Sequence, residues 1–288
     1  MTSSDDTSYL FPLLDVGPED AGFRLQNEPD ELQRKHVAQF QSSDITYQAD
    51  LFAVVHGTIE PNGNHGVLII LDFQFYGSVA GERRFKHIKV AVAFGRKDKN
   101  IGDRHDPIVL QMAPDGPFRM DETKEGVETV VEGNASLSGG PSLATLGIGG
   151  SYQRTTTVDN TRYTTLNGQK WTNGRRYGKK NTAIWRINEN PVSKDGVPPK
   201  LRAAILIEIP ESCGPFKAEL TVDAKVDVLY QAERILRSSR YIAPVYFDKQ
   251  DGEWRNVGPS LADVAPDNLS GCNLSLIGTA KSPTLVES

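Results

Sequence analysis

The sequence predicts an all-β protein, an antiparallel β-sandwich or barrel with about eleven strands and a few short helices. Short apolar or alternating runs recur at fairly even spacing from Tyr47 onward. Helical periodicity, by contrast, is confined to two short stretches. Turn dipeptides that tolerate positive φ separate the runs, namely Asn62-Gly63, Asp115-Gly116, Asn173-Gly174, Asp195-Gly196 and Asp251-Gly252.

The elements follow from these runs in chain order. The expected strands are residues 47–58, 66–76, 84–94, 108–112, 128–137, 143–157, 162–171, 182–187, 201–209, 216–228 and 241–247. Short helices are expected at residues 30–40 and 227–236, where apolar side chains fall on one stripe.

Three strands indicate which of their faces are buried. Residues 216–228 alternate cleanly between apolar and polar side chains, which is typical of a strand with one face on the core. Residues 66–76 are apolar on both faces up to Asp72, and residues 201–209 behave in the same way. We therefore expect these last two strands in the middle of a sheet, covered on both sides.

Residues 143–171 are rich in glycine and threonine and predict a long, twisted hairpin. Its turn is placed at Asp159-Asn160, and Gly147, Gly149 and Gly150 punctuate one arm. Both a barrel corner and a ligand-contacting loop fit this pattern. The predicted organisation is a lead-in over residues 1–44, a single β domain over 45–265 and a flexible tail over 266–288.

Composition restricts the classes of function. The 288 residues carry 32 basic and 37 acidic side chains, a net charge of −5, so the basic excess that nucleic-acid binding uses is missing. No apolar run approaches the roughly 20 residues that span a bilayer, so stable membrane insertion is not expected. The start lacks signal-peptide features, and Cys213 and Cys272 are expected as thiols. These features predict a cytoplasmic protein.

Sequence motifs for metal or cofactor chemistry are missing. The chain has no nucleophile elbow, phosphate loop or zincin motif. Its five histidines do not fall at metal-ligand spacings, and neither cysteine has a second cysteine nearby. We therefore expect neither a metal nor a cofactor.

Polar and aromatic side chains on apolar strands are the candidate site residues. Arg186 and His87 are the candidate catalytic groups, because a cation or donor can polarise a carbonyl. The candidate substrate-binding residues are Asp72, Phe73, Phe75, Tyr76, Trp185 and Tyr241. Structural roles stay open: Asp72 could pair with Arg84 or Arg186. His87 could face solvent, and Trp185 could be a core residue.

Several segments together carry a family resemblance over roughly residues 47–228. They are Val-Leu-Ile-Ile-Leu-Asp-Phe-Gln-Phe within residues 66–76, Arg83-Arg84-Phe85-Lys86, Met112-Ala-Pro-Asp-Gly116, Leu-Gly-Ile-Gly-Gly at 146–150, and residues 177–185. In this order they resemble a largely uncharacterised fungal family of β-rich proteins. The nearest characterised activity is that of the norbornene-forming Diels–Alderase of the sordarin pathway. The resemblance implies a role in secondary metabolism and carries over no catalytic residue.

Two functions of different classes follow. The first is a cofactor-free, Diels–Alderase-type cyclase acting on an apolar terpene or polyketide intermediate, since a pericyclic reaction gains mainly from a near-attack geometry. The alternative is a non-catalytic carrier of a small molecule, or an interaction or membrane-active module that uses the hairpin of residues 143–171. An enclosed apolar cavity would favour a cyclase or carrier. A solid core with an exposed hairpin would favour the module. The oligomeric state stays open.

Overall fold

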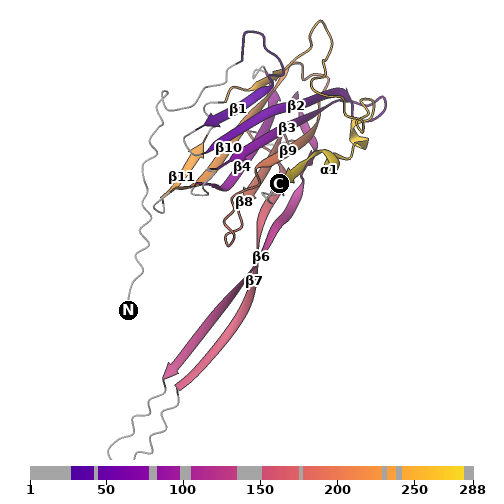
Figure 1. Cartoon of the computed structure of the whole chain (residues 1–288). Helices are drawn as coiled ribbons and strands as arrows, with labels where there is room; N and C mark the ends of the chain where they lie inside the picture. The colour runs from indigo at the N-terminus through magenta and orange to yellow at the C-terminus, as the bar shows by residue number, and fades with distance from the viewer. Residues whose placement is uncertain are drawn as a thin grey trace, which may run out of the picture.

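The computed structural model describes residues 27–41, 45–77, 83–97, 105–134, 151–174, 178–228, 232–237 and 242–281. Within these ranges, thirteen strands form two antiparallel sheets that pack face to face (Figure 1). The sheets stay separate and do not close into one barrel. The prediction of an all-β sandwich is therefore confirmed.

The first sheet contains six strands. Its order is β1 (His36–Gln41), β2 (Thr46–Thr58), β3 (His65–Tyr76), β9 (Lys200–Glu208) and β13 (Thr279–Lys281), and β5 (Ile108–Ala113) also pairs with β9. The apolar β3 and β9 lie side by side in the middle of this sheet, as their two apolar faces predicted.

The second sheet contains seven strands. Its order is β11 (Ala232–Arg237), β10 (Phe216–Val228), β4 (Phe85–Arg96), β8 (Thr182–Asn188), β7 (Ser151–Trp171) and β6 (Gly116–Asn134), and β12 (Val245–Phe247) also pairs with β10. The alternation in β10 is the predicted one, because Phe216, Leu220 and Val222 are buried. Their polar neighbours therefore occupy the outer face.

Large side chains fill the space between the sheets. Trp185, Phe73, Phe94, Phe216 and Phe247 are all less than 2% exposed, and they belong to one continuous cluster of buried apolar residues. Phe216 and Phe247 stack with ring centroids 4.7 Å apart. Burial of this apolar area is the main stabilising contribution to the sandwich.

The end of the described chain covers the outer face of the first sheet. Leu269, in the turn Leu269–Gly271, and Leu274, in α1 (Leu274–Ile277), are buried in a second apolar cluster with Leu68, Ile70 and Leu206. This cover explains why β3 and β9 are apolar on both faces. It also places ordered, buried residues within the range 266–288 that the sequence presented as a flexible tail.

Two predicted helices are wrong. Residues 36–41 form β1, which pairs with β2, and the range 227–236 contains the end of β10 and most of β11. Hydrogen bonds to a neighbouring strand outweigh a weak helical stripe in both places, because local propensity is easily overridden by tertiary pairing.

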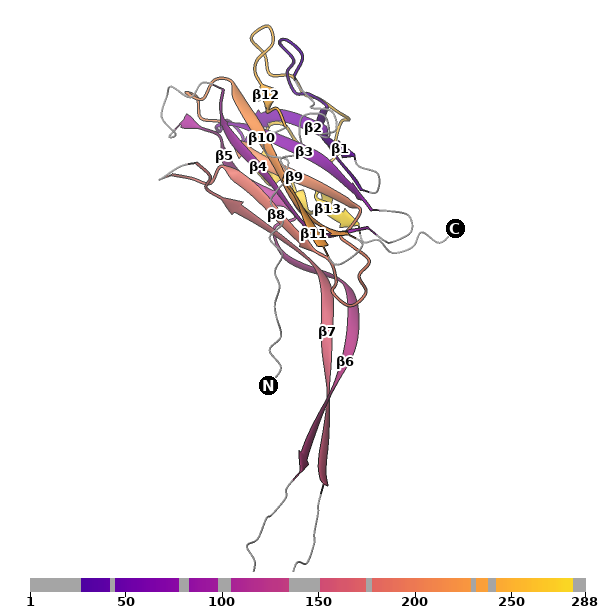
Figure 2. The same cartoon turned by 90° about the vertical axis from the view of Figure 1, so that its left-hand side faces the viewer.

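The predicted hairpin is also wrong in its boundaries. β7 runs without interruption through Asp159-Asn160, and its partner is β6, with Val127 opposite Val158 and Asn134 opposite Ser151. The predicted turn is therefore the middle of a strand. Gly147, Gly149 and Gly150 lie outside the described residues. Figures 1 and 2 show β6 and β7 leaving the sandwich and continuing far beyond it as a twisted, two-stranded ribbon.

Candidate functional site

The feature that distinguishes this sandwich is the β6–β7 ribbon. Its root lies in the second sheet, where Thr165–Trp171 of β7 pair with β8 and Gly116–Met120 of β6 pair with β7. The register shifts between Met120 and Thr123, where Asp121 adopts a positive φ of 53°. A bulge of this kind bends a strand, and the ribbon leaves the sandwich at this point.

One buried side chain holds the root. Asn190 is 0% exposed, and its Nδ2 donates to the carbonyl of Asp121 at 2.7 Å, to Thr123 Oγ1 at 2.6 Å and to the carbonyl of Arg162 at 3.3 Å. Its backbone N–H donates to Thr164 Oγ1. Asn190 therefore joins both arms of the ribbon to the loop that follows β8.

An ion-pair network fixes the start of that loop. Arg84 Nε donates to Glu189 Oε2 at 2.8 Å, and its guanidinium contacts Asp227 Oδ2 at 2.6 Å. Burial by itself would lower the pKa of Arg84, but hydrogen bonding to and attraction by Glu189 and Asp227 raise its pKa above the ordinary value. The guanidinium therefore stays charged and fixes the position of Glu189, the residue that precedes Asn190 in the chain.

Beyond the root, the ribbon has no third strand among the described residues. Register pairs run from Thr123–Arg162 to Asn134–Ser151, which is 12 positions on each strand. At about 3.4 Å per residue, this length is roughly 40 Å. Among the described residues, both outer edges thus lack a neighbouring strand, an arrangement that soluble proteins usually avoid.

The register divides the residues of the ribbon between two faces. One register face receives Thr123, Glu125, Val127, Thr129, Val131, Gly133, Tyr152, Arg154, Thr156, Val158, Asn160 and Arg162. The other receives Lys124, Gly126, Glu128, Val130, Glu132, Asn134, Ser151, Gln153, Thr155, Thr157, Asp159 and Thr161. From Gly126 to Asn134 and over their partners, the first face carries three valines, one tyrosine and one charged residue, whereas the second carries one valine and three carboxylates. This distal part of the ribbon is therefore amphipathic in its sequence register, and the charged Glu125 and Arg162 of the first face lie closer to the root.

The residues predicted as walls of a substrate site lie in the core. Trp185 is 0% exposed, and its Nε1 donates to the carbonyl of Pro114 at 2.9 Å. Phe73 and Phe75 are buried on the same side of the first sheet, with ring centroids 6.3 Å apart. Phe73 lines neither of the surface depressions described below, whereas Phe75 lines the smaller one together with Tyr76.

The two predicted catalytic residues lie on the outer face of the second sheet. His87 pairs in register with Asn188, and its Nδ1 is 2.8 Å from Asn188 Oδ1. Arg186 is opposite Lys89 on the same face, whereas Trp185 points into the core. The structure therefore does not bring Arg186 and Trp185 into one site.

The remaining predicted residues are dispersed. Asp72 forms a bidentate ion pair with Arg202, at 2.6 and 2.7 Å, and not with Arg84 or Arg186. Arg202 also lies over the ring of Phe52, 3.9 Å from its centroid. Tyr76 is 43% exposed at the end of β3. Tyr241 lies outside the described residues.

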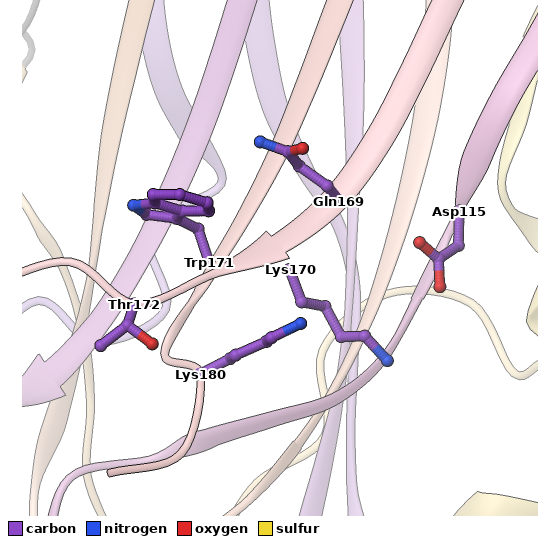
Figure 3. Close-up of a pocket in the computed structure, with 6 residues that line it drawn as sticks. All are labelled: Asp115, Gln169, Lys170, Trp171, Thr172 and Lys180. Atoms are coloured by element: carbon purple, nitrogen blue, oxygen red, sulfur yellow. The ribbon is translucent and has the colours of Figure 1, made fainter. Parts of the chain in front are cut away.

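The surface depressions on the described part of the molecule include two that bear on the site. One, of about 500 Å³, lies at the end of β7 remote from the ribbon, and Figure 3 shows the residues that line it: Asp115, Gln169, Lys170, Trp171, Thr172 and Lys180. The other, of about 320 Å³, lies beside Tyr76. Both are open to solvent and partly polar. They offer hydrogen-bonding groups and, at Trp171, an exposed aromatic face, but not an apolar enclosure.

The described residues form neither a metal-binding cluster nor a membrane-spanning helix. Within the described ranges, no group of three or more His, Cys, Asp or Glu side chains is positioned to hold a metal ion. No helix in those ranges is long and apolar enough to cross a membrane.

Sequence reasoning missed the residues that define this site. Asn190 had no local signal, because its partners are about 30 to 70 residues away in the chain. The sequence predicted strands in the ribbon but did not predict how they pair. Residues 128–137 were expected as a strand and residues 143–171 as a separate hairpin, so the pairing between them was not predicted.

Comparison with known proteins gives no assignment. No family model matches the chain, and no curated protein matches it in sequence. Among solved structures, the chain is similar to the Clostridium perfringens NetB toxin in its membrane-inserted form, with 10% identity, a TM-score of 0.28, and coverage of 77% of this chain and 99% of that one.

Two further solved structures have similar values. Clostridium perfringens delta-toxin gives 7% identity, a TM-score of 0.30, and coverage of 77% of this chain and 93% of that one. A structure described as a pore forming protein gives 11% identity, a TM-score of 0.28, and coverage of 73% and 92%. Likeness at this level identifies no family for this chain.

Proposed function

We propose that this protein is a non-catalytic, membrane-active module that contacts lipid bilayers through the β6–β7 ribbon. The observation that carries the proposal is the ribbon itself, which is 12 register pairs long, amphipathic in register from Gly126 to Asn134, and without a third strand among the described residues. An isolated two-stranded ribbon is marginally stable at best in water. A partner that covers its apolar face supplies the burial that the sandwich does not.

The length and composition of the ribbon suit a bilayer. A strand needs about 9–11 residues to cross the hydrocarbon layer, fewer than the 12 positions here. Residues 135–150, which join the two strands in sequence, contain no Asp, Glu, Lys or Arg, in a chain that is 24% charged. Charged groups are costly in hydrocarbon, so this composition fits entry of the ribbon into lipid.

The unpaired edges of the ribbon imply that more than one copy of the protein acts on the membrane. Hydrocarbon offers no hydrogen-bond partner, so each unpaired backbone group costs several kcal/mol there. A single inserted ribbon would leave both edges unpaired. Ribbons of several copies, paired side by side in the lipid, satisfy these groups. The active form on a membrane is therefore an assembly.

The cyclase and the carrier stay predictions with less support. Both need an apolar enclosure, and the predicted walls Phe73, Phe75 and Trp185 are packed into the core. A solid core with a projecting hairpin is the arrangement that favours the module. Incubation of the protein with terpene and polyketide precursors would test the cyclase directly.

Release of a trapped dye from lipid vesicles tests the proposal, with two matched substitutions. Val127 and Val130 lie on the same strand but on opposite faces of the ribbon. Val127→Glu places a charge on the apolar face and is expected to reduce release at least 10-fold, since a charge in hydrocarbon costs about 2.5–3.5 kcal/mol. Val130→Glu, on the face that already contains Glu128 and Glu132, is expected to stay within about twofold of the wild type.

The vesicles should include phosphatidylcholine alone and its mixtures with phosphatidylserine and with sterol. Circular dichroism and thermal unfolding of both variants provide the folding control. Equal effects of the two substitutions would contradict the assigned face. The proposal is wrong if the wild-type protein neither binds nor permeabilises any of these vesicles.

A further inference from the structure

A second unusual feature lies at the end of the sandwich remote from the ribbon. Residues 248–258, here called the strap, run along the edge of β2 beyond the point where β1 ends. Val54 and Val257 exchange two backbone hydrogen bonds, of 2.8 and 3.0 Å. The N–H of His56 donates to Asn256 Oδ1 at 2.8 Å, and Gln33 Nε2 donates to the carbonyl of Arg255 at 3.0 Å.

Three stacked rings join the strap to the sheet. Trp254 of the strap lies 4.9 Å from His56 of β2 and 5.2 Å from His65 of β3, measured between ring centroids. The two imidazoles lie 5.6 Å from each other, and all three interplanar angles are between 11° and 16°. Trp254 also contacts Phe216 of the core. The strap is therefore held by aromatic packing on two histidines.

Three of the four ring nitrogens of the two imidazoles lack a hydrogen-bond partner among the described residues. Both ring nitrogens of His56 and Nε2 of His65 are buried, and they have no hydrogen-bond partner in the described part of the chain. A neutral imidazole has one N–H, whereas an imidazolium has two and a full charge. Burying an unpaired charge is far more costly than burying a neutral ring. The packed strap therefore tolerates the neutral histidines only.

The charged groups around the rings increase this preference. His65 acts on His56 from β3, and Lys249 acts on His65 from the strap, so both neighbours oppose a positive charge. Lys249 lies 5.9 Å from the centroid of Trp254. From β10, the facing residue is the apolar Phe216. From β9, Glu208 is opposite Gly66, off the face of His65, and is hydrogen-bonded by Asn64.

The sign of the pH dependence follows from these surroundings. Burial, and to a smaller extent His65, lowers the pKa of His56 from 6.5 to about 3. Burial and Lys249 also lower the pKa of His65, and a hydrogen bond with the backbone of Gly57 offsets part of this lowering. When the strap opens, both groups regain an ordinary pKa. The closed form is thus fully stable above pH 6.5 and loses stability as the pH falls from 6.5 towards 3.

We propose that the strap is an acid-released latch, in which protonation of His56 and His65 detaches residues 248–258 from β2. Release opens the edge of β2 between Val54 and His56 and exposes the end of the core at Phe216. For His56 alone, the two pKa values correspond to an increase of about 30-fold in the opening equilibrium between pH 7.5 and pH 5.0. His65 adds to this increase.

Amide hydrogen exchange of the full chain at pH 7.5 and 5.0, corrected for the intrinsic rates, measures the release. The amides of Val54, His56 and Val257 are expected to lose at least 30-fold in protection at pH 5.0. Ile69 and Ile205, in the middle of the first sheet, serve as internal controls and keep their protection. Equal loss at all five amides would indicate general acid unfolding and would overturn the latch.

Two sets of variants assign the effect. His56→Phe combined with His65→Phe keeps ring stacking but removes the titrating groups, so the pH dependence of the strap amides should disappear. His36→Phe is the matched control, because His36 lies on β1 and its side chain is 61% exposed. It should leave the pH dependence unchanged. Persistence of the 30-fold change in the double variant would show that other groups control the strap.

A measurement on the wild-type protein covers the case in which the double variant does not fold. Titration of the histidine ring protons by NMR gives the pKa of His56 directly. A value well below 5 supports the latch, and a value near 6.5 contradicts it.

Discussion

The two ends of the same pair of strands differ in what surrounds them. At the root, β7 lies between β6 and β8, Leu166 is buried in the core, and Asn190 binds both arms. Beyond Thr123 and Arg162, the same two strands have no strand partner but each other among the described residues. The root is thus stabilised by the sandwich, whereas the distal ribbon is not paired with any other strand of the described part of the chain.

Because of this difference, we expect the root to determine the stability of the protein and the distal ribbon to determine its proposed function. Side chains at the root are held by packing and by buried hydrogen bonds, so their replacement affects the free energy of unfolding. The distal ribbon is expected to be nearly neutral for the stability of the sandwich. Under the proposed function it is the part that meets lipid.

The largest expected effect comes from removing the distal ribbon. Replacing residues 124–161 with Asn-Gly joins two register partners, Thr123 and Arg162, through a two-residue turn that suits antiparallel strands. We expect release of dye from vesicles to be abolished, while the free energy of unfolding changes by about 1 kcal/mol or less. Denaturant unfolding and the vesicle assay measure the two effects. A shortened protein that still permeabilises vesicles would remove the ribbon from the function.

Trp185→Ala tests the sandwich end of the comparison. The side chain is fully buried and its Nε1–H is paired with the Pro114 carbonyl, so the loss of packing should lower the free energy of unfolding by about 3–5 kcal/mol. Urea unfolding monitored by circular dichroism gives the value. Trp185→Phe keeps most of the ring volume and should lose clearly less. Equal losses in both variants would show that packing around this ring is unimportant.

Asn190→Ala tests the junction between the two ends. It removes the donor shared by Asp121, Thr123 and Arg162 and leaves part-buried acceptors without this donor. We expect a loss of about 1–3 kcal/mol in the free energy of unfolding, together with faster hydrogen exchange at the root of the ribbon. Asn167→Ala, at an exposed position on β7, is the control and should change stability by less than about 0.5 kcal/mol.

The smallest effect is expected on the outer face of the first sheet. Asp72→Asn breaks the bidentate pair with Arg202, but the two side chains are 27% and 37% exposed. Water screens such a pair, so we expect a loss of about 0.5–1 kcal/mol that shrinks at high salt. Denaturant unfolding at 0.05 and 1 M NaCl measures it. A loss above about 2 kcal/mol would instead indicate a buried, functionally important pair.

Much of the sandwich could be predicted from the sequence. Clean alternation in residues 216–228 and the two-sided apolar run of residues 66–76 each indicate a face, because side chains alternate across a strand. The turn dipeptides were equally informative. Gly116, Gly174, Gly196 and Gly252 all adopt positive φ, and so does Asn62, which precedes Gly63. Each of these signals depends on residues that are adjacent in the sequence, so it can be recognised without the tertiary structure.

The candidate site could not be predicted in the same way. β6 and β7 pair over residues that are distant in sequence, and the dipeptide Asp159-Asn160 permits a turn without enforcing one. Likewise, β1 and β11 show weak helical periodicity, but hydrogen bonds with β2 and β10 hold them as strands. The partners of Asn190 and the stack of His56 on Trp254 are also remote in the chain.

The sequence by itself determined the fold class, most strands of the sandwich, the turns and the burial of β3 and β9. Tertiary structure alone decided that β6 and β7 project as one ribbon and that residues 269–277 cover the first sheet. The reason is physical. Turn conformation and alternating burial depend on neighbouring residues, whereas strand pairing, register and the contents of a site depend on contacts between distant segments, which no local pattern specifies.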